Sequence, residues 1–260
     1  MVFFAAVMSL FITSINSGSN GNCYYVGNET EAVLIDIGIS CTETEKRMKA
    51  LGLSMKKVKA VFVSHEHTDH TKGVSTLANK YQLPVYISEG TAANGPRLIR
   101  QLVQNFNANE PVSMGSLSVT PFSKQHDAAD PYSFIISSNG ITAGVFTDIG
   151  TACPQVILYF KQCHAAFLES NYDEDMLENG PYSQLLKDRI RGDLGHLSNT
   201  QALDLFLQHR PEFMQHLILS HLSSRNNNPE IVETLFTKQA TGVNITIASR
   251  KGAIPIITIT

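Results

Sequence analysis

The chain has 260 residues, of which 43% are hydrophobic and 17% charged, as is ordinary for a globular protein with a large core. Its formal net charge is −3, whereas a protein that coats nucleic acid over a broad surface usually carries a basic surplus. Any nucleic-acid substrate would therefore have to be held locally, near a site. No linker, charge block or tandem repeat interrupts the sequence, which predicts a single domain over residues 1–260.

The N-terminus and the cysteines favour a cytoplasmic protein. Residues 2–8 are apolar, but no Lys or Arg precedes them, which argues against a signal peptide, and the stretch is too short to span a membrane. Met8 is an alternative start, which would leave residues 1–7 as a disordered extension. The four cysteines include no C-x-x-C pair, so reduced thiols are expected rather than a zinc knuckle or a disulfide scaffold.

In the first half of the chain, short β-branched runs alternate with helical patterns. The expected strands are 10–15, 23–26, 32–37, 59–63 and 84–87. One helix is expected to open at Thr42, with Glu45 three residues later in a capping-box spacing. A second helix is expected over 72–81, which completes a β-α-β unit.

The second half of the chain shows the same alternation of strand and helix patterns. The expected strands are 117–122, 132–137, 141–146, 165–168, 217–219 and 243–248, and the expected helices are 154–162, 182–191, 198–209 and 229–238. Ser198 and Gln201 again have the spacing of a capping box. The alternation indicates an α/β protein in which sheets pack together with helices outside, but the pattern leaves the topology open.

The most informative segment is His65-x-His67-x-Asp69-His70, which follows an apolar strand. Side chains alternate in extended chain, so His65 and His67 project to one side and can meet one metal ion, while Asp69 and His70 can face a second. Imidazole and carboxylate ligands suit Zn²⁺, Mn²⁺ or Fe²⁺ better than Mg²⁺ or Ca²⁺. The alternative is a solvated loop that contains histidines, which this density of ligand types disfavours.

Three further candidates end hydrophobic runs. These are His126, Asp148 and His221. A single His or Asp in such a place is more often a core or capping residue. All three are expected at the carboxyl ends of strands, as is the segment 65–70, and this shared placement favours the completion of two metal shells.

The chain resembles the metallo-β-lactamase superfamily over nearly its whole length, in Asp36, the segment 65–70, His126, Asp148 and His221. The resemblance implies a four-layer αββα sandwich. It implies that one metal is held by His65, His67 and His126 and the other by Asp69, His70 and His221, with Asp148 as a bridge and Asp36 as a support. His67 stands where flavodiiron oxidoreductases carry Glu, which favours hydrolytic over redox chemistry. His70 stands where the antibiotic-hydrolysing lactamases carry a residue other than His, which disfavours antibiotic hydrolysis.

Glu169 ends another apolar strand, and His196 precedes the capped helix. The pair is similar to the Glu and His with which tRNA 3′-processing nucleases of the superfamily protonate the leaving oxygen. With Asp69, they form the expected catalytic set. A carboxylate that orients an imidazole can keep a proton donor available near neutral pH. An exposed Glu and a histidine beside a helix start remain the alternative.

The loop 17–22 contains glycines that could aim backbone N–H groups at one point, a phosphate nest that would include Ser19, Gly21 and Asn22. A tight hairpin explains the same residues and is the preferred interpretation of the loop alone. Lys187, together with nearby arginines, could also contact phosphate, but interleaved acidic residues favour a solvated helix face.

Several motifs together resemble the bacterial YycJ (WalJ) group, namely 17–22, 64–67, 126–131, 169–171, 195–199, 219–223 and 226–228. This resemblance implies a 5′-to-3′ DNA exonuclease linked to DNA repair, with two divalent ions, Zn or Mn with Fe as a further option, and a metal-bridging hydroxide as nucleophile. The alternatives are hydrolysis of a small phosphodiester or thioester, and a non-catalytic metal-binding partner protein. No membrane partner is expected, and the oligomeric state stays open.

Overall fold

Two mixed β-sheets form the centre of the molecule. The computed structural model describes residues 9–260, so the expected extension over residues 1–7 and the alternative start at Met8 lie outside it. In spatial order, the first seven-stranded sheet of the described chain contains β14 (Ile257–Ile259), β1 (Leu10–Asn16), β2 (Cys23–Gly27), β3 (Ala32–Ile35), β4 (Val58–Phe62), β5 (Val85–Tyr86) and β6 (Val103–Gln104). Strands β3 to β6 run parallel, whereas β14, β1, β2 and β3 pair antiparallel.

The second sheet has the same arrangement. Its order among the described residues is β13 (Asn244–Ile247), β12 (His216–Ser220), β11 (Ala165–Glu169), β10 (Ile141–Phe146), β9 (Tyr132–Ser138), β8 (Leu117–Ser123) and β7 (Val112–Met114). Strands β10 to β13 are parallel, and β7 to β10 are antiparallel. In each sheet the carboxyl ends of the parallel strands meet at one edge, which is where sites form in α/β proteins.

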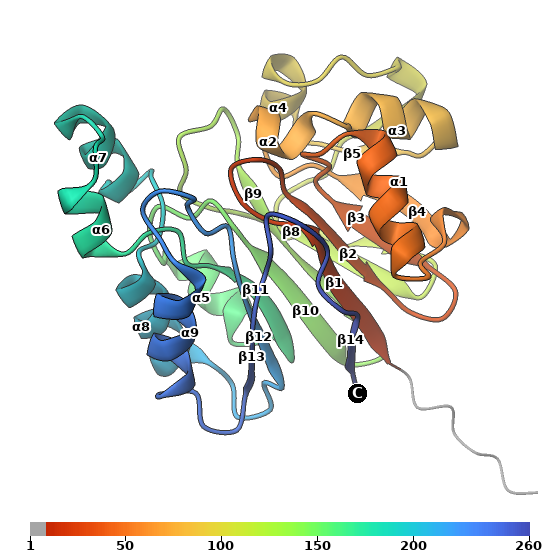
Figure 1. Cartoon of the computed structure of the whole chain (residues 1–260). Coiled ribbons are helices and arrows are strands. Elements are labelled where there is room, and N and C mark those ends of the chain that lie inside the picture. The colour runs from red at the N-terminus through yellow and green to blue at the C-terminus, as the bar shows by residue number, and fades with distance from the viewer. Residues whose placement is uncertain (1–8) are drawn as a thin grey trace, which may run out of the picture.

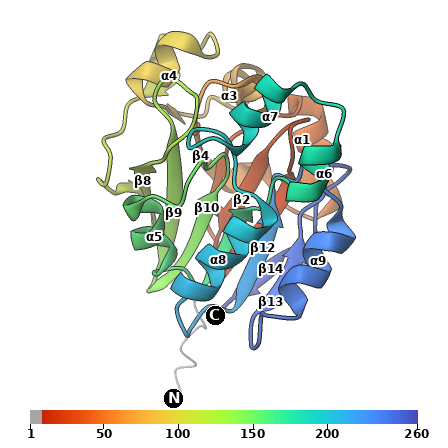
Figure 2. The ribbon, with the colours of Figure 1, turned by 90° about the vertical axis from the view of Figure 1, so that its left-hand side faces the viewer.

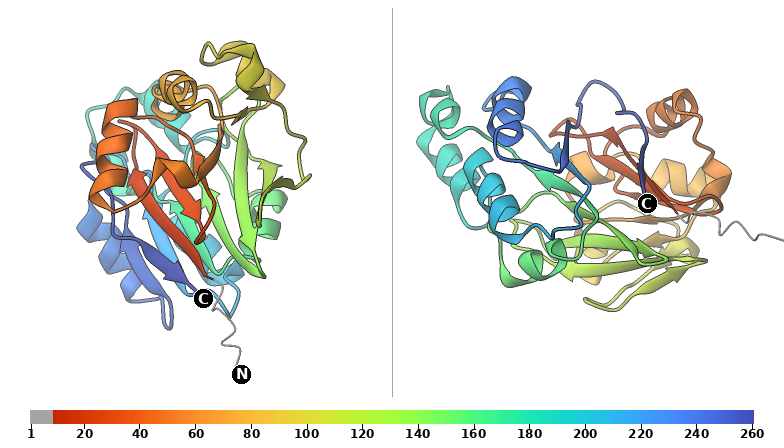
Figure 3. Two further views of the ribbon diagram at one scale, coloured as in Figure 1. Left: turned by 90° about the vertical axis from the view of Figure 1, so that its right-hand side faces the viewer. Right: turned by 90° about the horizontal axis from the view of Figure 1, so that it is seen from below.

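Helices cover the outer faces of both sheets, and the view from below in Figure 3 shows four layers. The first sheet is covered by α1 (Cys41–Ala50) and α3 (Val74–Tyr81), and the second by α5 (Pro154–Phe160), α8 (Asn199–His209) and α9 (Pro229–Thr237), as Figure 1 shows. The shorter helices are α2 (Thr68–Thr71), α4 (Glu89–Asn94), α6 (Glu174–Asn179), α7 (Gln184–Arg191) and the 3₁₀ turns Met55–Lys57 and Arg100–Leu102. The αββα sandwich is thus confirmed.

The largest buried cluster lies between the two sheets, where side chains from both inner faces interdigitate. Tyr24 of the first sheet and Phe167 of the second have ring centroids 4.9 Å apart, and the rings of Phe62 and Phe134 are 5.6 Å apart. Such packing leaves little freedom to the strand ends that it supports. Two further clusters join each sheet to its own helices.

One predicted helix start is wrong. Helix α1 begins at Cys41 and is capped by Ser40, whose hydroxyl accepts from the backbone N–H of Glu43, so Thr42 lies inside the helix. Extended backbone at Ser40 places its side chain over the first turn. Glu45, the expected partner of Thr42 in a capping box, forms an ion pair with Lys80 instead. The second expected capping box, Ser198 with Gln201 at the start of α8, is confirmed.

The remaining differences concern short elements. The sequence pattern did not indicate β6, β7, β14, α4 or α6, whose lengths of two to six residues are too short for a clear period. Figures 1 and 2 show α6 and α7 beyond the helix layer formed by α8 and α9. Within residues 9–260, we find no helix with the length and apolar character needed to cross a membrane.

Candidate metal centre

Three of the predicted site residues stand in the left-handed backbone region directly after strands. Asp36 follows β3 with φ 58°, Asp148 follows β10 with φ 55°, and His221 follows β12 with φ 57°. This conformation is uncommon for residues other than Gly and costs free energy, but Asp and His tolerate it better than most. The chain therefore turns sharply where each strand ends, and the turn carries the side chain to the shared edge of the sheets.

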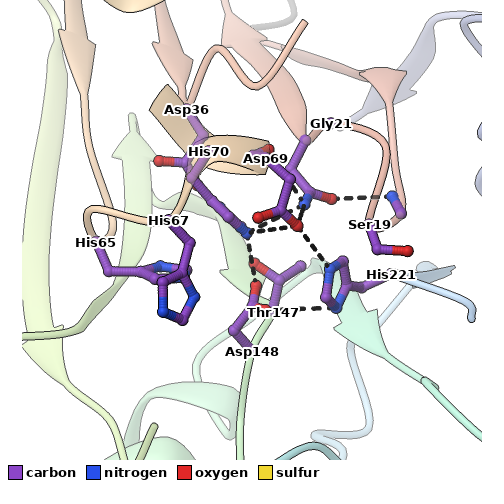
Figure 4. Close-up of polar contacts among 12 residues, drawn as sticks. Ser19, Gly21, Asp36, His65, His67, Asp69, His70, Thr147, Asp148 and His221 are labelled. Atoms are coloured by element: carbon purple, nitrogen blue, oxygen red, sulfur yellow. Dashed lines mark hydrogen bonds and ion pairs between the residues drawn. The ribbon is translucent and has the colours of Figure 1, made fainter. Parts of the chain in front are cut away.

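Three histidines form one half of the centre. His65 Nε2 lies 3.1 Å from His67 Nδ1, and their donor atoms lie within 4.8 Å of a ring nitrogen of His126. Nδ1 of His126 is 3.1 Å from the carbonyl of Gly195, so its N–H donates there and Nε2 remains for a ligand. Figure 4 shows His65 and His67 side by side next to Asp148.

The second half combines Asp69, His70 and His221, whose ligand atoms also lie within 4.8 Å of one another. His221 Nε2 is 3.6 Å from a carboxylate oxygen of Asp69. Asp148 joins the halves, because its Oδ2 lies 3.0 Å from His70 Nε2 and its Oδ1 lies 3.7 Å from His126 Nε2. The structure thus brings all seven sequence-predicted ligands together with Asp148 between the two halves, and a bridging role for Asp148 stays a prediction.

Asp36 and Ser64 orient the rings behind this cluster. Asp36 Oδ2 lies 2.7 Å from His70 Nδ1, and its two oxygens accept from the backbone N–H and the hydroxyl of Ser64. Ser64 Oγ also lies 2.9 Å from His65 Nδ1. Because the protein engages Nδ1 of both rings, Nε2 of each is directed to the centre. Asp36 therefore lies behind the ring of His70, and its role as a support of the metal site stays a prediction.

Glu169 connects two histidines with different expected roles. Its Oε1 lies 2.8 Å from Nδ1 of His196 and 2.8 Å from Nδ1 of His221. Its Oε2 accepts from the backbone N–H groups of Ile149 and Leu197. Sequence reasoning placed Glu169 beside His196 but missed the bond to His221. One carboxylate thus holds a candidate ligand and a candidate acid in fixed orientations.

The pKa values of the buried histidines differ between the two halves of the centre. Burial lowers the pKa of His126 to about 4, aided by the nearby Lys124, so this ring is neutral as a metal ligand requires. The pKa of His70 is raised to about 10 despite its burial, because Asp148 and Asp36 favour the charged ring. Burial by itself would raise the pKa of Asp148, but the surrounding histidines hold it well below its ordinary value. The half that contains Asp69 and Asp148 therefore favours positive charge, either on its histidine rings or from bound cations.

Two ligand atoms test whether this arrangement fits metal ions. His126 Nε2 and His221 Nε2 are buried, and neither has a hydrogen-bond partner within the described chain. Buried polar atoms without partners are costly, and coordination of a divalent cation would satisfy each of them. The donor set thus fits divalent metal ions. The assignment of individual residues to each ion stays a prediction.

A cavity of about 220 Å³ opens beside the centre. One part of its wall holds His196 and most of the candidate ligands, and another part includes Tyr182, Leu186 and Ile190 from the region of α7. Sequence reasoning did not find this apolar wall, since hydrophobic residues on a helix usually indicate core. It also missed Lys124, which is buried and donates to the carbonyl of Thr147 at 2.6 Å. The only available signal was the position of Lys124 between a predicted strand and His126.

The loop 17–22 has the form of a tight turn. The N–H of Gly21 donates to the carbonyl of Gly18, and the N–H of Asn22 donates to the carbonyl of Asp69, so neither is left for a phosphate. The Asn22 amide instead lies 3.1 Å from His70 Nε2. Of the predicted nest, Ser19 lines the cavity. Figure 4 shows Ser19 and Gly21 on the side of His221 and Asp69.

Comparison with known proteins identifies the family. Residues 31–222 match the model of the β-lactamase superfamily domain. The chain is 34% identical over 228 residues to "Exodeoxyribonuclease YycJ" of Bacillus anthracis, covering 86% of both chains, and 27% identical over 229 residues to "Exodeoxyribonuclease WalJ" of Streptococcus pneumoniae, covering 86% of this chain and 85% of that one. The metallo-β-lactamase fold protein YhfI of Bacillus subtilis superposes with a TM-score of 0.73 at 17% identity, covering 95% of this chain and 99% of YhfI. The chain belongs to the β-lactamase superfamily, and it is a metal-dependent hydrolase that uses divalent cations.

Proposed function

We propose that the protein is a 5′-to-3′ DNA exonuclease that works with two Zn²⁺ or Mn²⁺ ions. The observation that carries the proposal is the Glu169–His196 pair, bonded at 2.8 Å at the edge of the seven clustered ligand candidates. A hydrolase needs such a proton donor when the departing group is a poor one, as a sugar oxygen is. A thiolate leaves without an acid, so the pair favours a phosphodiester over a thioester.

The proposed roles follow from the contacts. His65, His67 and His126 would hold one ion, and Asp69, His70 and His221 the other, with Asp148 between them. Paired divalent ions activate water and neutralise charge at phosphorus. Because Glu169 accepts the Nδ1 proton of His196, the remaining ring nitrogen is the one available to protonate the leaving oxygen. The side chain of His196 is 22% exposed and lines the cavity, so substrate can reach it.

The names of the relatives support a DNA substrate. Both YycJ and WalJ are described as exodeoxyribonucleases, and the match to each extends over most of both chains. The net charge of −3 requires that a DNA strand be gripped near the site rather than over the whole surface. A link to DNA repair and a cytoplasmic location stay predictions.

The test is cleavage of end-labelled DNA. The purified protein is incubated with Mn²⁺ or Zn²⁺ and single strands labelled at the 5′ or 3′ end, beside a His67→Ala variant and a surface control, His209→Ala. We expect release of labelled mononucleotides from the 5′ end and shortening ladders from 3′-labelled strands. We expect His67→Ala to reduce the rate about 100-fold or more, as the loss of a group at a metal site does.

Different outcomes separate the candidate functions. Intact DNA with hydrolysis of bis(p-nitrophenyl) phosphate would favour a small phosphodiester as substrate, and hydrolysis of a thioester alone would favour a thioesterase. Cleavage that is equal in the wild type and in His67→Ala would remove the metal centre from the reaction. Digestion from the 3′ end would keep the nuclease and reverse the proposed polarity.

A further inference from the structure

A second groove, of about 560 Å³, adjoins the cavity of the metal centre. It lies between the turn after β12 and the segment that follows β13. Ser223 lines both hollows, and Ser19, which lines the metal-centre cavity, accepts a 3.4 Å hydrogen bond from Arg250 of the groove. The groove and the cavity therefore meet at these two serines, so an extended ligand at the metals could continue into the groove.

The groove differs from the metal centre in charge. Arg250 and Lys251 line it together with serines, an asparagine and apolar residues, and none of its lining residues is acidic. Within residues 9–260, neither cation forms an ion pair with a carboxylate, although most other Lys and Arg side chains lack one too. The groove is distinguished by two adjacent cations in a lining without acidic residues, in a chain of net charge −3.

The Arg250 guanidinium also has unused hydrogen-bonding capacity. Its Nη2 donates to Ser19, but its Nη1 is buried and has no acceptor among the described residues. An unsatisfied buried donor is unfavourable, and a guanidinium suits phosphate oxygens because it can present two parallel N–H groups. The carbonyl of Arg250 accepts from the Asn20 amide at 2.9 Å, which links its main chain to the loop 17–22. An acceptor for the guanidinium is therefore expected from a ligand beside this loop.

We propose that the Arg250–Lys251 groove binds a phosphate of the substrate strand other than the one that is cleaved. The inference rests on the proposed function, which it deepens: the substrate would be a nucleic-acid strand that spans both hollows, not a small phosphodiester that fills one. Serine hydroxyls and a cationic pair contact the sugar-phosphate backbone without reading base sequence. The groove thus contributes affinity, while the metal centre performs hydrolysis.

Binding of metal-free protein measures this contact without turnover. With EDTA present, the dissociation constant is determined by fluorescence anisotropy for a labelled single strand, with a 5′-phosphate or a 5′-hydroxyl, and for an abasic strand that keeps only the backbone. The variants are Arg250→Gln, Arg250→Lys, Lys251→Gln and the double Gln variant. Lys56→Gln is the matched control, because Lys56 lies before β4, at the opposite end of that strand from His65.

We expect the double variant to weaken binding of all three strands about tenfold, and each single Gln variant about threefold. The slope of log affinity against log salt should fall by about 0.7 for each phosphate that the variant no longer binds. Arg250→Lys should retain part of the affinity, and Lys56→Gln all of it. Lys251→Gln guards against a folding artefact, since its exposed side chain can be changed without disturbing the loop at Ser19.

Each result is decisive. If the double variant binds the strands as tightly as Lys56→Gln does, the groove does not hold the strand, even where the wild type digests DNA. If the wild type fails to digest DNA but the double variant still loses affinity for the abasic strand, the binding role of the groove is supported and the proposed nuclease activity is contradicted. A loss of affinity restricted to the 5′-phosphorylated strand would identify the terminal phosphate as the ligand. An equal loss for the 5′-phosphorylated and 5′-hydroxyl strands would identify an internal phosphate.

Discussion

The two walls of the metal-centre cavity are built in opposite ways. The ligand wall consists of strand ends that the core holds, and its side chains are tied down by buried acceptors such as Asp36 and Glu169. The α7 wall stands outside the helix layer, and its helix is held by exposed ion pairs such as Arg189 with Asp127. Lys187, which was expected on a solvated face, is instead buried and donates to the carbonyl of Glu178. Buried networks rigidify a structure, whereas exposed ion pairs contribute little.

This difference assigns the reaction to the ligand wall and the binding of substrate to the α7 wall. The ligand wall leaves its functional atoms one arrangement each, as metal binding requires. The α7 wall presents apolar side chains and the exposed Arg189, which lie outside the buried clusters of the core. We infer that substitutions in the ligand wall abolish the reaction, whereas those in the α7 wall alter substrate affinity.

The largest effect is expected from Asp148→Asn, which tests the ligand wall at the point that joins its two halves. Asn has the same shape and tolerates the left-handed backbone, so the fold should be kept. Loss of the charge between two cations should reduce bound metal from two ions to one or none per chain and the cleavage rate about 1000-fold. Elemental analysis and a DNA digestion assay measure both. Asp204→Asn, at an exposed position of α8, is the control, and an unchanged metal content in Asp148→Asn would contradict the bridging position.

An intermediate effect is expected from His196→Ala, which separates acid catalysis from metal binding within the same wall. Cleavage of DNA should fall about 100-fold to 10⁴-fold, as for other general acids. The metal content should not change, because His196 is not among the proposed ligands. Hydrolysis of bis(p-nitrophenyl) phosphate should fall far less, because p-nitrophenolate leaves without a proton. If both substrates lost activity equally, His196 would have a structural role instead.

The smallest effect is expected from Leu186→Ala, which tests the α7 wall. Leu186 lines the cavity, while its neighbour Leu185 is 83% exposed and is absent from the lining, so Leu185→Ala is a control on the same helix. We expect KM for DNA to rise about threefold to tenfold with kcat unchanged, since the contact involves the bound strand and not the reacting atoms. A drop in kcat with KM unchanged would mean that α7 belongs with the chemistry, and would remove the contrast between the walls.

The same contrast explains what the sequence could predict. Strand ends with His and Asp carry a periodic signal and a chemical signal together, so the clustering of His65, His126 and Asp148 could be predicted. The αββα sandwich is expected only from the resemblance to the superfamily, because the pattern leaves the topology open. The double contact of Glu169 could not, because it depends on how β11 and β12 pair. The wall at Leu186 gives no signal either, since a leucine on an amphipathic helix indicates core equally well.

The left-handed turns at Asp36, Asp148 and His221 also limit which residues can replace them. Glu could supply a carboxylate at position 148 and Cys a thiolate at position 221, yet neither is among the residues that adopt positive φ most often. Asp, Asn, His and Gly are the residues that this backbone accepts most readily. The main chain thus narrows the choice of ligand before any ion is bound, and drift toward a softer, sulfur-binding metal would require the strand ends themselves to be rebuilt.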